Sequence, residues 1–265
     1  MRKEMFLVMV ALAVFAGTVF AGPSWTGATG DGLWTTNLNW DSGVAPGTGS
    51  TPIVRSAYYT NGFHPTFAAG MTGFYGQVIV GYPDAAGLFE ARLDVTGGSM
   101  ITNSLWISFG WDTSYKGVIN MSGGSINATS EIRVGYYGAA GRLNMSNGTI
   151  TGGNMFLGSD GGKGTIQLSG GTIDVPYLGM YGSSLFNISG TGKLIVNDAD
   201  GTIASDLLLG YYAGSDMLTG NGLADDAQLN IVWDGVGHTT VTAIPEPATL
   251  SLLSLGIAAL IRRKK

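Results

Sequence analysis

The sequence predicts an all-β fold, a single-stranded β-solenoid (β-helix) of short glycine-rich coils. The first observation is a repeat in which an apolar-polar-apolar triplet precedes a turn rich in Ser, Thr, Asn and Gly. Its copies begin at Leu93, Ile119, Leu143, Ile166 and Phe186, so they recur every 20 to 26 residues. Repeats of this length are typical of stacked architectures. The second observation is the period of two inside each copy, which indicates half-buried strands. The third is that no segment between residues 85 and 200 shows a helical period.

A second half-repeat alternates with the first. It consists of two or three apolar residues that are followed by a glycine. Its copies are Val78–Gly81, Trp106–Gly110, Ile132–Gly135, Met155–Gly158, Tyr177–Gly179 and Leu207–Gly210. Gly-Gly and Asn-Gly pairs supply the positive φ angles that tight corners need. Coils stacked about 4.8 Å apart would pair their backbones and bury a continuous core. A β-propeller is the structural alternative, but its blades usually need about 40 residues or more.

Composition narrows the possible functions. Gly accounts for 44 of 265 residues, charged residues for 12%, and there is no Cys. We therefore expect no disulfide, no thiolate metal site and no Cys nucleophile. Residues 22–244 hold 7 Lys and Arg against 16 Asp and Glu. An acidic body with few cations argues against nucleic acid as a partner.

Residues 1–21 have the features of a secretory signal peptide and therefore predict an N-terminal signal helix. Arg2 and Lys3 form a basic start, residues 6–14 are apolar, and residues 19–21 fit a cleavage site. This segment predicts export through the Sec translocon. A retained membrane anchor is the alternative, although the apolar run is short for a membrane span.

Residues 22–76 are expected to form an aromatic N-terminal cap. Trp25, Trp34 and Trp40 lie among Gly and Thr, and residues 56–76 suggest a hairpin or a poorly formed first coil. The first coil exposes an apolar end and a free strand edge, which large aromatic side chains can cover. The region loosely resembles the start of secreted β-solenoids of Gram-negative bacteria, including autotransporter passengers. A tryptophan platform for sugars is the alternative.

The solenoid repeats are expected over residues 77–236, with a regular stack from Val78 to about Gly210. The alternating residues 227–233 predict a last strand. Residues 237–243 are polar and β-prone, and are assigned as a linker to the tail.

The tail, residues 244–265, carries the most specific signal. Pro245, Glu246 and Pro247 precede fourteen mostly apolar residues, 248–261, and the chain ends with Arg262, Arg263 and two Lys. The apolar stretch predicts a hydrophobic C-terminal helix about 21 Å long, short of the roughly 30 Å hydrocarbon core.

These three parts, in this order, closely resemble the PEP-CTERM sorting signal. The resemblance implies an exosortase-type processing enzyme as partner and transient anchoring in the inner membrane through the C-terminal helix. It also implies a Gram-negative host that makes exopolysaccharide, with the exported protein at the cell surface or in the matrix. A plain C-terminal anchor without processing is the alternative.

No catalytic motif is evident, and no cofactor or metal is expected. A lyase-like solenoid is the enzyme alternative; by resemblance it would use Asp and Glu for Ca²⁺ and an Arg or Lys base. Asp112, Arg133, Arg142 and Asp160 are candidates for such a site, but they occupy different positions in the repeat. Asp198 and Asp200 are interpreted as solvated turn residues. Asn side chains are expected to form ladders between coils.

Aromatic residues that follow the glycine corners are the most regular feature outside the core. They are Tyr82, Trp111, Tyr136, Tyr181 and Tyr211. Equivalent positions stack in a solenoid, so these side chains are expected to form a column along one corner. The column is either an internal ladder that stabilises the corner or an exposed strip that stacks on sugar rings.

The sequence thus predicts a secreted, non-enzymatic structural or adhesive protein of the cell surface or exopolysaccharide matrix. An extracellular polysaccharide is the candidate ligand. The competing prediction is a carbohydrate-active enzyme of the polysaccharide-lyase type.

Overall fold

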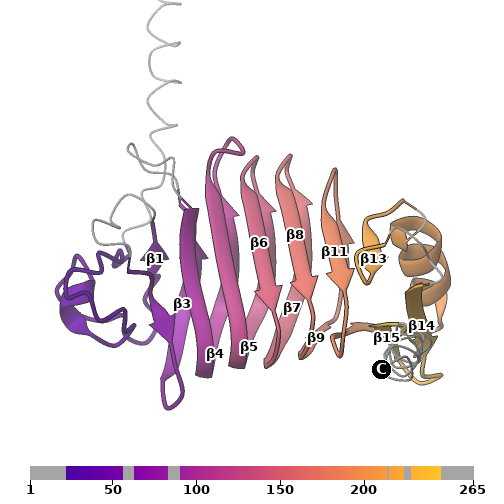
Figure 1. Cartoon of the computed structure of the whole chain (residues 1–265), viewed down its shortest axis with the longest axis horizontal. Helices are drawn as coiled ribbons and strands as arrows, with labels where there is room; N and C mark the ends of the chain where they lie inside the picture. The colour runs from indigo at the N-terminus through magenta and orange to yellow at the C-terminus, as the bar shows by residue number, and fades with distance from the viewer. Residues whose placement is uncertain (1–21, 56–62, 83–89, 214, 224–227, 246–265) are drawn as a thin grey trace, which may run out of the picture.

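The computed structural model describes residues 22–55, 63–82, 90–213, 215–223 and 228–245, and it is an all-β solenoid (Figure 1). Parallel strands from successive coils stack along the long axis of the molecule. The expected signal helix and C-terminal helix lie outside the described residues. None of the described residues belongs to a helix that is long and apolar enough to cross a membrane.

Each coil crosses three faces, and strands stack in parallel on each face. The first face holds β2 (Thr66–Phe67), the starts of β4 (Glu90–Phe109) and β5 (Lys116–Tyr136), then β6 (Ala140–Met145), β8 (Lys163–Leu168), β11 (Leu185–Ile188) and β13 (Leu218–Gly220). The second holds the start of β3 (Thr72–Val80), the middles of β4 and β5, the start of β7 (Thr149–Ser159), β9 (Thr172–Val175) and β12 (Lys193–Asn197). The third holds β1 (Ile53–Val54), the ends of β3, β4, β5 and β7, and β10 (Leu178–Met180).

The sequence repeat is the structural coil. Leu93 pairs with Ile119, Ile119 with Leu143, Leu143 with Ile166, and Ile166 with Phe186. All five side chains are fully buried, whereas Asp94, Asn120, Asn144 and Gln167, which follow the first four, are partly exposed. The predicted solenoid and its phase are therefore confirmed.

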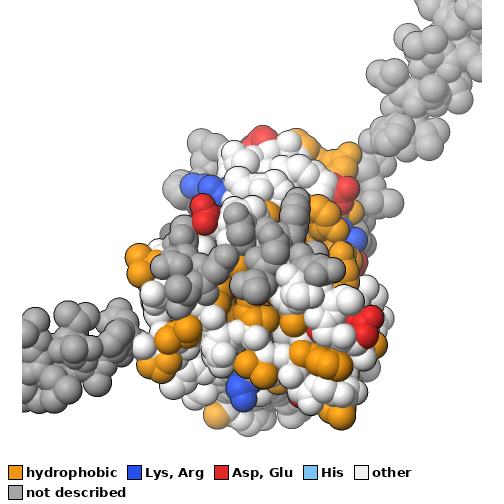
Figure 2. Space-filling model, turned by 90° about the vertical axis from the view of Figure 1, so that its right-hand side faces the viewer, with side chains coloured by type: hydrophobic (Ala, Val, Ile, Leu, Met, Phe, Trp, Pro, Cys, Tyr) orange, Lys and Arg blue, Asp and Glu red, His pale blue; other side chains and the backbone are white. Residues whose placement is uncertain are grey.

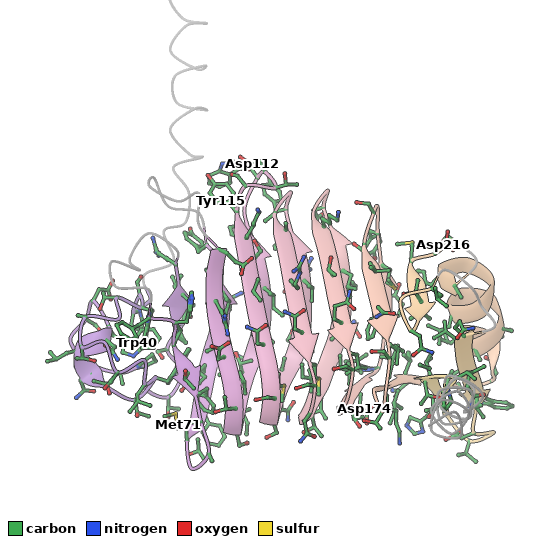
Figure 3. The ribbon with its side chains drawn as sticks, viewed as in Figure 1. Trp40, Met71, Asp112, Tyr115, Asp174 and Asp216 are labelled. Atoms are coloured by element: carbon green, nitrogen blue, oxygen red, sulfur yellow. The ribbon has the colours of Figure 1, made fainter. Side chains whose placement is uncertain are left out.

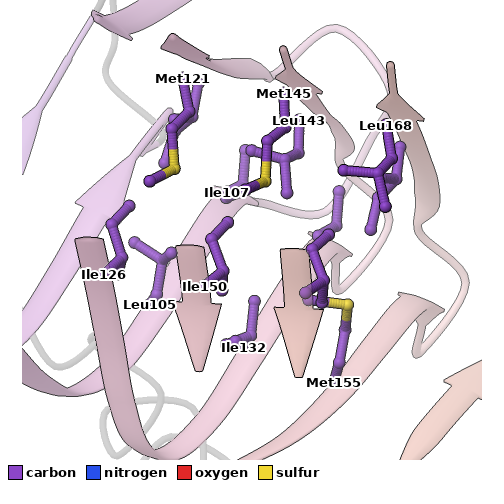
Figure 4. Close-up of a cluster of buried hydrophobic side chains, with 14 of the residues drawn as sticks. Leu105, Ile107, Met121, Ile126, Ile132, Leu143, Met145, Ile150, Met155 and Leu168 are labelled. Carbon is purple, nitrogen blue, oxygen red and sulfur yellow. The ribbon is translucent and has the colours of Figure 1, made fainter. Parts of the chain in front are cut away.

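Inward side chains from all three faces fill the interior between the sheets (Figure 4). The inward positions are almost all Leu, Ile, Val and Met, and most are completely buried. Burying one such side chain stabilises the fold by about 1.5–3 kcal/mol. Because each coil supplies only a few of them, the core exists only when the coils stack.

Glycine sets the corner between the first and second faces. Gly98, Gly124, Gly148 and Gly171 occupy equivalent positions with φ between 77° and 96°. Residues with a Cβ atom rarely adopt this backbone. The prediction that Gly-Gly and Asn-Gly pairs supply positive φ at the corners is confirmed.

The N-terminal end of the stack is filled by three tryptophans. Trp25, Trp34 and Trp40 are at most 2% exposed, and their rings meet edge to face at 4.8–5.3 Å. The Trp34 indole N–H donates to the Tyr75 hydroxyl at 2.8 Å. A short 3₁₀ helix, η1 (Asn37–Asn39), lies beside them. Because β3 pairs with β4 from Thr72 onward, the regular stack begins before the expected Val78.

The C-terminal end departs from the prediction in two places. Leu207–Gly210 was expected as a strand, but it lies in a π-helix, η3 (Ile203–Ala213). Residues 237–243 were assigned as a linker, but they form β15 (His238–Ala243). β15 pairs antiparallel with β12 on one side and with β14 (Leu229–Trp233) on the other. Antiparallel pairing therefore ends the parallel stack (Figure 1).

The helix η3 also supplies hydrogen-bond partners to the free edge of β10. The Tyr212 hydroxyl accepts from the Met180 backbone N–H at 3.1 Å and donates to the Leu178 carbonyl at 3.2 Å. One hydroxyl can do both because it is a donor and an acceptor. It takes the place of the next parallel strand. Where side chains are coloured by type in the view onto this end, several groups of hydrophobic side chains are visible (Figure 2).

Asp198 joins the last coil to this end. It is only 1% exposed, so the interpretation as a solvated turn residue was wrong. Its carboxylate accepts hydrogen bonds from the Thr239 hydroxyl and from the backbone N–H groups of Gly201, Ile203 and Ala204. Burial acts to raise the Asp198 pKa, but these hydrogen bonds outweigh it and hold the pKa below 3.8.

Candidate functional site

A row of aromatic rings runs along the outer side of the third face and its corner. Tyr82 stacks on Phe109 with centroids 5.8 Å apart, and Phe109 lies 5.4 Å from Tyr136 and 6.1 Å from Tyr137. Trp106 packs against both Phe109 and Tyr136 at 5.2–5.3 Å. The strand register places these residues on consecutive coils. We call this row, together with Phe156, Tyr177, Tyr181 and the arginines that lie over its rings, the aromatic strip.

Arg133 connects two coils of the strip. Its guanidinium carbon lies 4.3 Å from the Tyr136 centroid and 5.1 Å from the Phe156 centroid. The guanidinium pairs with Glu131 at 2.9 Å, and Glu131 also accepts from the Trp106 indole N–H at 2.9 Å. Burial disfavours the charge, but the hydrogen bond and charge of Glu131 outweigh it and raise the Arg133 pKa. The group stays cationic, so its attraction to the rings persists at any physiological pH.

Arg55 repeats this arrangement at the start of the strip. Its guanidinium carbon lies 4.8 Å from the centroid of Tyr82.

The far end of the strip depends on a glycine. Gly179 occupies the outward position that Phe156 and Arg133 fill in the preceding coils. A Cβ atom there would lie about 3.0–3.1 Å from atoms of Tyr181, Phe156 and Tyr177. The three rings therefore gather over a bare stretch of backbone. Tyr177 is 38% exposed and Tyr181 is 44% exposed, so this end is open to solvent.

The five predicted aromatic residues do not form one column. Tyr82 and Tyr136 lie in the strip and Tyr181 at its end. Trp111 is 65% exposed and packs against Tyr115 in the corner loop after β4, the loop in which Asp112 is labelled (Figure 3). Tyr211 lies in η3, outside the strand register. The positions diverge because corners of different length follow the same glycine.

Sequence reasoning missed Phe109, Phe156 and Tyr177. Phe156 and Trp106 occupy the same outward position inside the second half-repeat, between two buried residues. That alternation was a usable signal. The predicted column used only residues that follow each glycine, whereas Phe109, Phe156 and Tyr177 precede it.

The candidate enzyme residues separate onto different parts of the fold. Arg133 and Asp160 approach to 3.6 Å on the third face. Arg142 lies on the first face, and Asp112 lies in the corner loop, where it accepts from the Ser114 backbone N–H at 2.6 Å. Among the described residues, no three His, Asp or Glu side chains gather as a metal-binding set.

The outer side of the first face carries a polar ladder. Asn120 donates to Asp94 at 2.9 Å, and Asn144 donates to Asn120 at 2.8 Å. In later coils Asn187 donates to Gln167 at 2.9 Å. The Asn147 side chain accepts from the Gly148 N–H within its own turn, but the predicted ladder between coils is confirmed at Asn120, Asn144 and Asn187. It lines a hollow of about 400 Å³ together with Ser and Thr side chains from the neighbouring turns.

The folded body runs directly into the tail. The Ile244 backbone N–H donates to the Gln228 carbonyl at 2.8 Å, and the Ile244 carbonyl accepts from the Asn221 amide at 2.9 Å. Pro245, the next residue, is exposed. The other predicted sorting residues, Glu246, Pro247, Arg262 and Arg263, lie outside the described residues.

A family model for the PEP-CTERM protein-sorting motif matches residues 243–265. No curated protein and no solved structure matches the chain. The matched segment begins at the last residue of β15. The chain therefore carries a PEP-CTERM sorting motif fused to a β-solenoid, which implies an exported protein that exosortase sorts to the cell surface.

Proposed function

We propose that the chain is a structural or adhesive protein of the cell surface or exopolysaccharide matrix of a Gram-negative bacterium, and that it has no catalytic activity. The observation that carries this proposal is the direct fusion of a sorting motif to a β-solenoid. The solenoid offers long side surfaces to a ligand, and the tail supplies delivery. The loose resemblance to autotransporter passengers belongs to this proposal.

The aromatic strip is the surface proposed to contact polysaccharide. Flat aromatic faces stack on the apolar faces of sugar rings, and they recur here along the axis of the stack. Tyr137, Tyr177 and Tyr181 are 38–51% exposed, so part of the strip is accessible. The internal contacts of Tyr136 also stabilise the corner, so both predicted roles, ladder and sugar platform, can belong to one strip.

The test compares the full-length protein with a variant that lacks residues 244–265, expressed in a host that makes exopolysaccharide. We expect the full-length protein in the surface and matrix fractions and the truncated protein elsewhere. Purified protein should co-sediment with the exopolysaccharide without releasing reducing or unsaturated ends. Equal distribution of the two forms, or absence of co-sedimentation, would contradict the proposal.

The same assay addresses the enzyme alternative. The closest approach of a cation to carboxylates on the third face is Arg133 with Glu131 and Asp160. Release of new sugar ends that disappears in Arg133→Gln would replace the structural proposal with a lyase-type activity.

A further inference from the structure

Cations of this acidic protein are concentrated on the first face. Residues 22–244 contain 7 Lys and Arg, and four of these, Arg92, Lys116, Arg142 and Lys163, lie on the neighbouring strands β4, β5, β6 and β8. The acidic side chains on the described strands of this face are Glu90 and Asp94. The first face is therefore locally positive, although the body as a whole is negative.

Three of the cations surround a hollow. Lys116 pairs in register with Ala140, and Ala140 pairs with Lys163, so the two lysines lie two strands apart, or about 9.6 Å. Arg142 lies on the strand between them, two residues beyond the small Ala140. These side chains and Glu90 line a hollow of about 210 Å³ whose walls include the backbone of Gly117 and Gly141.

These charges are available to a ligand. Arg92 is paired with Asp94 at 2.7 Å. Lys116, Arg142 and Lys163 are exposed, and within the described part of the chain they form no ion pair. Among the described residues, no salt bridge has to be broken when an anion binds these three side chains.

The hollow of about 400 Å³ continues on the same four strands. It is lined by Asp94, Asn120, Asn144 and Gln167 and by hydroxyl groups from the adjoining turns. Amides and hydroxyls are suited to hydrogen-bonding the many hydroxyls of a sugar chain, while ammonium and guanidinium groups suit carboxylates. The two kinds of group lie side by side along the axis of the stack.

We infer that the first face binds an acidic polysaccharide, with uronate carboxylates held by Lys116, Arg142 and Lys163 and sugar hydroxyls held by the amide ladder. This inference rests on the proposed matrix function and names the chemical class of its ligand, at a site separate from the aromatic strip.

Charge density favours a polysaccharide over nucleic acid. Double-stranded DNA carries about one negative charge per 1.7 Å of its axis. Three cations spread over roughly 10 Å on a negative body cannot neutralise such a density. A uronate polymer carries at most one carboxylate per sugar, so its charges match this sparse row. Screening beyond about 8 Å at physiological salt also lets the local positive charge act despite the net charge.

The test measures binding of the full-length chain to polygalacturonate and to neutral dextran at physiological salt and at higher salt, where the net negative charge of the body is screened. All arms carry Gln in place of Arg262, Arg263, Lys264 and Lys265, so that the basic tail does not bind the polyanion. The test variant adds Lys116→Gln, Arg142→Gln and Lys163→Gln. The matched control adds Lys193→Gln, because Lys193 is also exposed but begins β12 on the second face.

We expect the triple variant to bind polygalacturonate at least about 10-fold more weakly, with a shallower dependence on salt, and the Lys193→Gln protein to bind like its parent. Thermal unfolding should be unchanged, because all three side chains are exposed. Binding of the triple variant within 2-fold of its parent would overturn the inference, as would tighter binding of the parent to polyglutamate or DNA than to polygalacturonate.

A further pair of results separates this inference from the proposed function. If the triple variant still co-sediments with the host exopolysaccharide while Tyr177→Ala and Tyr181→Ala do not, the matrix function stands and the acidic-glycan site is wrong. If the parent fails to co-sediment with any polysaccharide, both are wrong.

Discussion

The Arg133 guanidinium carbon lies 4.3 Å from the centre of the Tyr136 ring, on the same strand of the same coil. Arg133 also reaches Phe156 on the next coil. The pair therefore joins neighbouring coils on the outside of the solenoid, where the hydrophobic core does not reach. This external contact means that the aromatic strip contributes to stability, in addition to its proposed role in polysaccharide binding.

The two roles of the strip can be separated with a pair of variants. Tyr136→Ala removes ring contacts to Trp106, Phe109 and Tyr137, and should lower the free energy of unfolding by about 1–3 kcal/mol. Tyr181→Ala should change it by less than about 1 kcal/mol, because Tyr181 is 44% exposed at the open end of the strip. Both should weaken co-sedimentation with polysaccharide. Denaturant unfolding checks stability, and loss of cooperative unfolding with unchanged binding would assign a purely internal ladder.

Asp198 should make the C-terminal end sensitive to acid. Its folded pKa lies below 3.8, so its contribution to stability is present above that pH and is lost as the pH falls through the folded value. Asp198→Asn should lower the stability at neutral pH by about 1–3 kcal/mol, because an amide nitrogen cannot accept the hydrogen bonds of one carboxylate oxygen.

Thermal unfolding from neutral pH down to about pH 2 checks this prediction. The difference between the parent and Asp198→Asn should shrink as the pH falls. Asp200→Asn is the control, because Asp200 is exposed and bonds only within its own turn, to Thr202. A constant difference across the pH range would contradict the role given to Asp198.

The Tyr212 hydroxyl should matter more than its size suggests. Tyr212→Phe keeps the ring but leaves the Met180 N–H and the Leu178 carbonyl without their partner, at a cost of about 1–3 kcal/mol. Hydrogen exchange at Met180 should accelerate in this variant. Tyr115→Phe is a suitable control, because Tyr115 lies in an exposed corner loop. Unchanged exchange at Met180 would show that a group other than the Tyr212 hydroxyl forms hydrogen bonds with the edge of β10.

Two glycines allow the strain of a corner to be separated from crowding. Gly124 and Gly161 have φ of 80° and 81°. A Cβ atom at Gly124 would lie 2.5 Å from backbone atoms of Gly97, whereas at Gly161 nothing lies within 4 Å. Gly161→Ala should cost about 1–2 kcal/mol from the backbone alone. Gly124→Ala should cost clearly more in urea unfolding, and equal costs would mean that the coils can move apart.

The sequence was most informative where one chemical pattern recurs. The coil is predictable from Leu93, Ile119 and Leu143, because each of these side chains must reach the same core. The corner is predictable from Gly124, because residues with a Cβ atom rarely adopt its positive φ angle. The end of the stack has no such repetition. Leu207–Gly210 copies the pattern of an inner strand but lies in η3, because local pattern does not reveal that no further coil follows.

The candidate surfaces were predictable only in part. Tyr82 and Tyr136 follow a glycine and were found, whereas Phe156 lies between two buried residues and was not. The cations of the first face are far apart in sequence, from Arg92 to Lys163, and only the strand register brings them together. The segment 238–243 was assigned as a linker because it is polar, and nothing local in the sequence shows that β12 and β14 pair with it on either side.

On the first face the strands pair without a register shift from the start of β4 to β8, which has a further consequence. A whole coil inserted between β5 and β6 would meet the same neighbours on both sides and leave both capped ends unchanged. Each insertion would lengthen the aromatic strip and the amide ladder by one step of about 4.8 Å. Duplication or loss of a coil would therefore change the number of equivalent positions along the proposed polysaccharide-binding surfaces, and with it the avidity for a repeating polymer, without any new kind of contact.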